Sequence, residues 1–190
     1  MNVPEQDTKN TATPGGESGV CRQLVYRQVR DGELPAEERQ GVAFQLLAGM
    51  GDARPHRAAL ARVFGHVGWL KVCVKLAALK RLLYVVIVEG RIVNWGWITV
   101  SFCRHYPVKD GDVVIGPLQT EEADRGQGYA TWGLKHAINA MVRRGHRVFF
   151  INTWDNNFVM RKVIAACGFG APIPSYPRAG ARIGGTGGNP

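Results

Sequence analysis

Residues 115–130 read IGPLQTEEADRGQGYA, an apolar run that passes through a polar segment into a glycine-rich one. The run 113–120 has the β-branched composition of a strand, and 129–143 repeats apolar residues at helical spacing. The sequence therefore predicts a short loop that leads from a strand into a helix. Backbone N–H groups in the first turn of such a helix lack intrahelical partners and, helped by the helix dipole, attract an anion.

Small residues in this loop favour phosphate binding, because Gly126, Gly128 and Ala130 allow a close approach to the backbone. An ordinary glycine turn before a helix is the alternative interpretation, since the chain has 24 glycines. A P-loop is excluded because no Gly-Lys-Ser/Thr follows, and a dinucleotide-binding fold is disfavoured because the loop lies late in the chain.

The first half of the chain is predicted to hold two helices, over 35–47 and 56–80. The second helix has a candidate buried face, and Gly65 and Gly68 are positions where it is expected to bend or break. That face comprises Leu60, Val63, Val67, Leu70, Val74 and Ala77.

The second half is predicted to be rich in strands. Residues 82–88 and 92–101 form a hairpin around Glu89-Gly90, followed by a strand over 113–120, a helix over 129–143, a strand over 148–152 and a helix over 156–167. An antiparallel meander followed by a strand-helix-strand crossover predicts an α/β fold, in which helices flank a mixed, mostly antiparallel sheet.

The two ends of the chain have compositions that do not favour a packed core. Residues 1–19 are predicted to be a disordered leader without a secretory signal, and 179–190 a flexible glycine-rich tail, so that 20–178 form one domain. A cytoplasmic location is expected. The four cysteines are widely spaced, which predicts reduced, mostly buried thiols and no metal site.

The formal net charge of +9 favours anionic partners. Lysines and arginines are spread along the chain rather than gathered on one stripe, so nucleic acid is not expected as a partner. Basic residues border the apolar positions of 60–77, which leaves a membrane-surface role as an alternative, but no stable insertion is expected. A charged outer face on a core helix explains the same pattern more simply.

The run Arg125-Gly126-Gln127-Gly128-Tyr129-Ala130 resembles the Gln/Arg-x-x-Gly-x-Gly/Ala signature of the GNAT acyl-CoA-dependent N-acetyltransferases. That family commonly carries an Asn in the next helix and Gly-Phe about eleven residues later. Asn157 and Gly168-Phe169 occur here at that spacing, so the resemblance extends over about 82–169.

The resemblance implies that acetyl-CoA is the acyl donor. Its pyrophosphate would lie on the loop and its pantetheine alongside strand 113–120, where Gly116-Pro117 suits a bulge that opens a cleft. The Leu118 N–H would stabilise the oxyanion. The implied coenzyme-binding residues are Leu118, Thr120, Arg125, Gly126, Gln127, Gly128, Tyr129, Ala130 and Asn157.

The catalytic acid and base are less clearly marked. Relatives often place Glu or His where this chain has Val114 and Gly116, so Asp112 is the candidate base, with a role in the turn at 109–111 as the alternative. Ile164 occupies the position of a common tyrosine acid, and Tyr176 is a substitute from a proline-flanked segment.

A small primary amine is the expected acceptor. The hairpin sequence YVVIVEGRIVNWGW at 84–97 is similar to that of GNAT members that modify amino sugars, which implies an amino sugar or a nucleotide amino sugar. His105 and Tyr106 are candidates to line its pocket. The alternatives are a peptide, polyamine or antibiotic amine, or a non-catalytic module that binds acyl-CoA.

Overall fold

The computed structural model describes residues 22–78 and 81–173. Its six strands form one sheet in the order β1-β6-β5-β4-β3-β2, in which only β5 and β6 are parallel neighbours. The strands are β1 (Gln23–Val29), β2 (Val42–Leu47), β3 (Leu82–Val88), β4 (Arg91–Val100), β5 (Val113–Thr120) and β6 (Val148–Trp154). The helices are α1 (Met50–Ala53), α2 (Arg57–Ala78), α3 (Tyr129–Arg143) and α4 (Phe158–Ala166), with 3₁₀ turns η1 (Arg54–His56) and η2 (Glu122–Asp124).

The predicted hairpin and the strand-helix-strand unit are confirmed. Glu89 and Gly90 connect β3 to β4 with φ of 49° and 73°, the left-handed geometry of a tight two-residue hairpin turn. Both strands are almost entirely buried, which explains their continuous apolar composition. Strand β6 continues two residues beyond its predicted end, and α4 begins two residues later and ends one residue earlier than predicted.

The predicted helix over 35–47 is wrong. Val42–Leu47 is strand β2, paired antiparallel with β3, and the segment before it is irregular. Side chains of α3 bind the backbone of that segment: Asn139 accepts from Leu34 N–H at 2.7 Å and donates to Leu34 O at 2.9 Å, and Trp132 donates to Glu37 O. These tertiary bonds use backbone groups that a local helix would need.

Strand β1 was not predicted. It pairs antiparallel with β6 along its whole length, so that the crossover strand is an inner strand of the sheet. The sequence of β1, QLVYRQV, has little apolar periodicity, and its burial comes from contacts with residues more than a hundred positions away. Gln28, for example, donates a hydrogen bond to Gly168 O at 2.9 Å.

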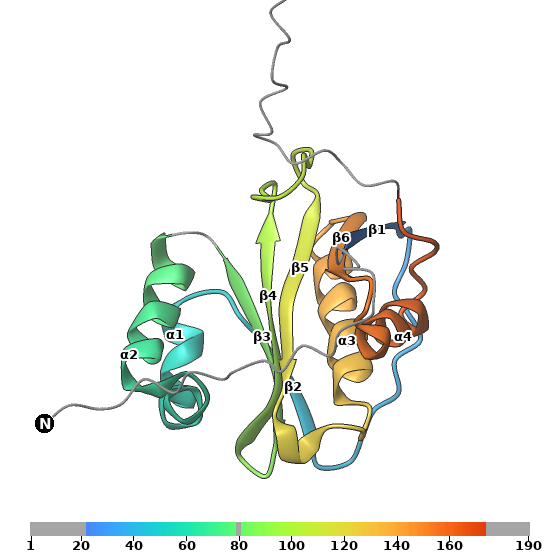
Figure 1. Ribbon diagram of the computed structural model, residues 1–190. Coiled ribbons are helices and arrows are strands. Elements are labelled where there is room, and N and C mark those ends of the chain that lie inside the picture. The colour runs from blue at the N-terminus through green and yellow to red at the C-terminus, as the bar shows by residue number, and fades with distance from the viewer. Residues whose placement is uncertain (1–21, 79–80, 174–190) are drawn as a thin grey trace, which may run out of the picture.

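Helices cover both faces of the sheet (Figure 1). Helices α3 and α4 lie on one face, over a core that includes Tyr84, Leu134 and Ile164. Helices α1 and α2 lie on the other face, where Leu60, Leu76 and the Trp97 ring are buried. The central strands therefore bury side chains on both faces.

The buried face predicted for helix α2 is partly wrong. Its backbone breaks at Gly65, where φ is 71° and ψ is 168°, as the glycine at this position suggested. Beyond the break Val72 and Leu76 face the core, whereas Val67 and Leu70 are 72% and 64% exposed. The break changes the orientation of the second part of α2 relative to the first. The residues buried after Gly65 therefore differ from those that a continuous helix would bury. None of the described helices is long and apolar enough to cross a membrane.

The described thiols are free. Cys73 and Cys167 are buried and Cys103 is partly buried, in line with the prediction, whereas Cys21 lies outside the described residues. Burial raises the pKa of the Cys167 thiol to about 12, so it stays protonated at neutral pH. The predicted leader lies within 1–21 and the predicted tail within 174–190, both outside the described residues.

We expect Gly133→Ala to destabilise the protein although alanine is the better helix former. An added Cβ would lie 2.7 Å from Asn94 Oδ1 and 2.8 Å from Val86 Cγ2, because α3 approaches the sheet closely there. The free energy of unfolding, measured by urea denaturation, should fall by about 1–3 kcal/mol. Gly51→Ala is the control, since that helical glycine has no atom within 4 Å of its Cβ position, and it should be neutral or stabilising. Equal effects of the two substitutions would contradict this packing account.

Candidate functional site

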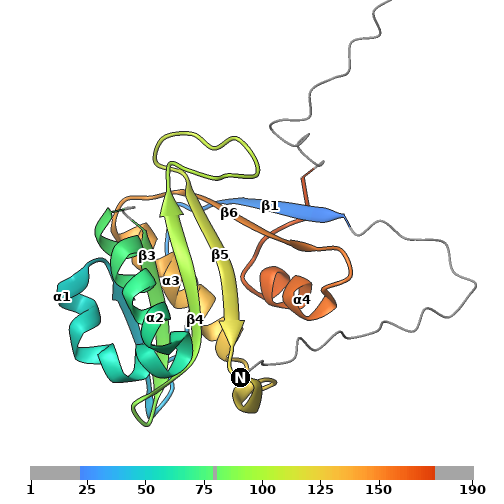
Figure 2. The ribbon, with the colours of Figure 1, turned by 60° about the vertical axis from the view of Figure 1, so that its left-hand side comes forward.

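Strands β5 and β6 pair over three residues only and then separate. Their parallel register ends at Ile115 and Ile151. At the same point β5 bulges against β4: Ile98 pairs with Ile115 and Gly96 with Leu118, so Trp97 faces both Gly116 and Pro117. The Gly116-Pro117 peptide is cis. The break that the sequence predicted at Gly116-Pro117 is thus present, and Figure 2 shows the two strands diverging beside α4.

The separation of the strands creates a cleft of about 550 Å³. One wall is β5 and the other is the end of β6 with the start of α4, while the loop between β4 and β5 lies at one end. The cleft is lined by Arg81, Thr99, Phe102, Cys103, Arg104, His105, Val114, Gly116, Pro117, Leu118, Asn152, Thr153, Trp154, Asn157 and Met160. About half of these residues are polar or charged, so the concave site suits a small ligand that carries polar groups.

The glycine-rich loop has the geometry of an anion site. Gly126 and Gly128 adopt φ of 80° and 78°, the left-handed conformation that glycine favours, and no atom lies within 4 Å of the Cβ position of Gly126. Gly128 is the N-cap of α3 and has no side chain to cap it. The N–H groups of Tyr129, Ala130 and Thr131 therefore have no partner within the helix and are available to an anion.

Arg39 is a residue of this loop region that sequence reasoning missed. Its guanidinium donates to Gln127 O at 2.9 Å and lies 5.9 Å from the centre of the Tyr129 ring. One of its nitrogens is 3.1 Å from the Cβ position of Gly128. Arg39 precedes β2 and is 88 residues from Gln127, so no local pattern links it to the loop. It adds a positive charge at the start of α3.

Two partly buried polar contacts hold the strand that leads into the loop. Asn94, fully buried on β4, donates to Gln119 O at 2.8 Å and to Thr120 Oγ1 at 2.9 Å. Arg91 pairs with the largely buried Asp124 at 3.4 Å. The hairpin that precedes β5 thus fixes the end of β5 and the turn η2 beside it.

The residues predicted to bind the coenzyme lie along one path. Leu118 and Asn157 line the cleft, and Asn157 also caps α4 by accepting from Met160 N–H at 3.0 Å. Thr120 lies further along β5, which leads through η2 to the exposed Arg125, Gly126, Gln127 and Gly128, and Tyr129 and Ala130 open α3. The predicted residues therefore follow β5 and η2 from the cleft to the loop, and their binding of a coenzyme stays a prediction.

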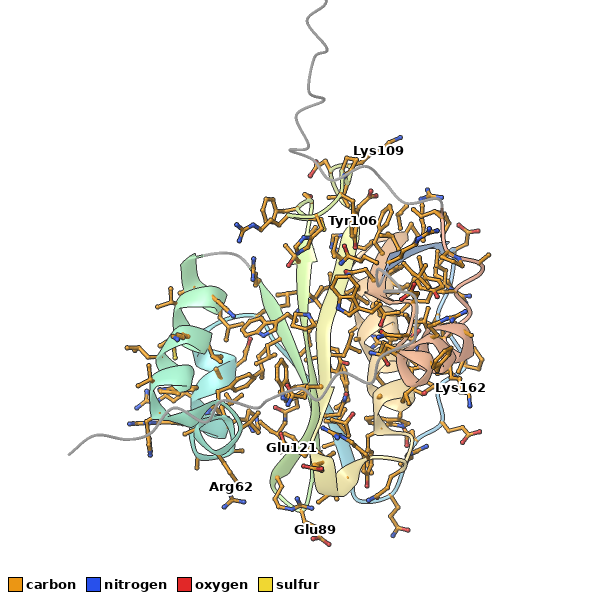
Figure 3. All side chains as sticks on the ribbon, in the orientation of Figure 1. Arg62, Glu89, Tyr106, Lys109, Glu121 and Lys162 are labelled. Carbon is orange, nitrogen blue, oxygen red and sulfur yellow. The ribbon has the colours of Figure 1, made fainter. Side chains whose placement is uncertain are left out.

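Asp112, the candidate base, lies outside the residues that line the cleft. It is buried, and its carboxylate accepts from Lys109 N–H at 2.8 Å while its own N–H donates to Lys109 O. Lys109 lies at the end of the sheet opposite Glu121, which begins the segment toward the loop (Figure 3). This placement favours the turn role that the sequence left as the alternative.

His105 is the cleft residue best suited to accept a proton. No Asp or Glu is among the described residues that line the cleft, and the Cys103 thiol is the other ionisable group there apart from the two arginines. Tyr106, the other candidate beside His105, is buried and packs 5.8 Å from the Phe150 ring. Ile164 is buried in the core, and Tyr176 lies outside the described residues.

Residues 73–169 match the family model described as the acetyltransferase (GNAT) family. The matched segment contains the cleft strands, the glycine-rich loop and α4. None of the curated proteins is detectably similar in sequence.

Solved structures share the fold. An acetyltransferase from the GNAT family of Colwellia psychrerythraea is 17% identical, with a TM-score of 0.56 over 80% of this chain and 53% of its own. A GCN5-related N-acetyltransferase from Sphaerobacter thermophilus is 21% identical, with a TM-score of 0.57 over 80% and 49%. The chain thus spans about half the length of these two. A third, AAC(6′)-Iy in complex with the bisubstrate analogue CoA-S-monomethyl-acetylneamine, is 13% identical, with a TM-score of 0.54 over 72% and 97%.

Replacing Asn94 should destabilise the protein, because its side chain holds the end of β5 before the loop. In Asn94→Ala, Gln119 O and Thr120 Oγ1 lose a buried donor, so the free energy of unfolding in urea should fall by about 2–3 kcal/mol. Thr120→Val removes one of the two bonds and should lower it by only about 1 kcal/mol. If the two substitutions were equally harmful, the bond to Gln119 O would have no part in stability.

Proposed function

Because the chain belongs to the GNAT acetyltransferase family, we propose that it transfers an acetyl group from acetyl-CoA to the primary amine of an amino sugar or a nucleotide amino sugar. The observation that carries the proposal is the cleft beside Leu118, which opens where β5 leaves β6. A thioester placed there would lie on the path that leads along β5 to the glycine-rich loop.

The proposed coenzyme contacts follow from unpaired backbone groups and charge. The diphosphate of acetyl-CoA would accept from the free N–H groups at the start of α3, with the helix dipole and Arg39 stabilising its charge. Pantetheine would extend along β5 past Thr120 and Leu118, and Asn157 would contact it from α4. In this arrangement Leu118, just beyond the bulge, supplies an N–H to the carbonyl oxygen of the thioester.

The reaction requires a neutral amine. Its nitrogen attacks the thioester carbon, the N–C bond forms, the C–S bond breaks, and CoA leaves as a thiolate that takes up a proton. The amine must also lose one proton, and His105 is the proposed acceptor because its imidazole lines the cleft. Asp112 is less suitable, since its carboxylate is occupied in the turn at Lys109.

An amino sugar suits the remaining lining. Phe102 and Trp154 lie at the cleft with 55% and 52% of their surface exposed, so each presents apolar ring area to a ligand. Asn152 and Thr153 add groups that hydrogen-bond to hydroxyls. Calorimetry with acetyl-CoA, followed by thiol release on glucosamine, glucosamine 6-phosphate and a nucleotide-linked amino sugar, tests the proposal. Absence of acetyl-CoA binding would overturn it.

Gly126→Asp should weaken acetyl-CoA binding, whereas Gly126→Asn should largely retain it. Asn and Asp both tolerate the left-handed backbone at Gly126 and have open space there, so charge is the main difference between the two variants. Repulsion from the diphosphate should raise the Kd of the Asp variant at least about fivefold above that of the Asn variant. Thermal unfolding should show both variants folded alike, and equal Kd values would place the diphosphate elsewhere.

His105→Gln should lower kcat by about a hundredfold, as expected for loss of a positioned base. The Kd for acetyl-CoA should not change, because His105 lies at the other end of β5 from the loop. Asp112→Asn is the matched test: it removes the charge of the other candidate, and its kcat should remain close to that of the unmodified protein. A larger loss in the Asp112 variant at unchanged stability would assign the base to Asp112.

A further inference from the structure

The cleft carries positive charge at the end that is remote from the glycine-rich loop. Arg81 directly precedes β3 and Arg104 lies in the loop between β4 and β5, and both line the cleft. The antiparallel register places the start of β3 beside the end of β4, where that loop begins. In Figure 3 Tyr106 and Lys109 mark this loop at the end of the sheet opposite Glu121. Strand β5 thus runs between the glycine-rich loop at one end and the two arginines at the other.

The charge of the two arginines is not neutralised by the part of the chain that is described. Within 22–78 and 81–173 neither guanidinium makes a hydrogen bond or an ion pair. The nearby carboxylates of the loop are occupied, since Asp110 accepts from the Ser101 hydroxyl at 2.6 Å and Asp112 from Lys109 N–H. No carboxylate lines the described cleft.

A third cation reinforces this charge. The Lys75 ammonium lies 4.7 Å from the centre of the Trp97 ring, on the α2 side of the sheet. The pKa of Lys75 is lowered mainly by burial and further by the positive charges of Arg81 and Lys71. Like charges are thus gathered without a described counter-ion, an arrangement that an anionic ligand would stabilise.

We propose that the acceptor carries a phosphate or carboxylate group besides its amine, and that the Arg81 and Arg104 guanidinium groups bind this anionic group. The inference rests on the proposed acetyl transfer and narrows its substrate class. Guanidinium groups bind both anions through paired N–H donors. With the coenzyme diphosphate at one end of β5 and the acceptor anion at the other, the amine would lie near Leu118, between them. A polycationic amine would be repelled from this end of the cleft.

The first test measures anion binding without turnover. The protein is saturated with CoA, so that the loop is occupied, and inorganic phosphate is titrated by calorimetry. The double variant Arg81→Gln/Arg104→Gln should bind phosphate at least about tenfold more weakly than the unmodified protein, since two charge-assisted contacts are lost. Arg62→Gln, an exposed arginine of α2 that does not line the cleft, is the control and should change nothing. Equal phosphate affinity in the double variant would overturn the proposal.

The second test compares matched amines by thiol release. Glucosamine 6-phosphate is compared with glucosamine to test the effect of a phosphate group. Serine is compared with serinamide to test the effect of a carboxylate. Spermidine serves as the polycationic amine. The preferred anionic amine should exceed its neutral partner at least about tenfold in kcat/KM, and the double variant should abolish that ratio. Faster acetylation of spermidine, or a ratio that survives in the double variant, would overturn the inference.

The two proposals fail in different ways. Loss of both arginines should leave acetyl-CoA binding unchanged, because neither lies in the glycine-rich loop. If acetyl-CoA binds but the arginines affect neither phosphate binding nor acceptor preference, only the acceptor class is wrong. If acetyl-CoA does not bind at all, the proposed transfer itself is wrong, whatever the result of the phosphate titration.

Discussion

The separation of β5 from β6 after Ile115 is the feature on which the site depends. Parallel neighbours in the middle of a sheet normally hydrogen-bond along their length and leave no space between them. Here the bulge at Gly116-Pro117 redirects β5 while β6 follows β1, so the strands diverge within a sheet whose two faces are already covered by helices. A cleft thus opens between them, and its polar side chains come from β6, the start of α4, the end of β4 with the loop after it, and the residue before β3.

The same strand connects two regions that favour negative charge. Beyond its end, after η2, the start of α3 presents free N–H groups with Arg39 beside them. At its start lie Arg104 and, from the neighbouring β3, Arg81. The first region derives its preference mainly from backbone geometry, whereas the second derives it from side-chain charge. For the proposed reaction, this division would orient both substrates toward the middle of β5.

The geometry of the loop is supported by tertiary contacts. Asn94 binds the end of β5, the Arg91–Asp124 pair holds η2, and Asn139 and Trp132 bind the segment that carries Arg39. Apart from Arg91 these side chains are buried, so leaving any of the buried groups without its partner would be unfavourable. The loop itself needs only glycine conformations, and its position is set by the elements packed around it.

The sequence by itself determined the elements whose signals are local. The hairpin around Glu89-Gly90, strand β5, helix α3 and the glycine-rich loop follow from apolar periodicity and from turn residues within a few positions of one another. Only the tertiary structure decided β1, β2, the contact of Arg39 with the loop and the placement of Arg81 and Arg104 in one cleft. Each of these depends on residues distant in the sequence, whose pairing energy outweighs the local preference of segments such as 35–47 for helix.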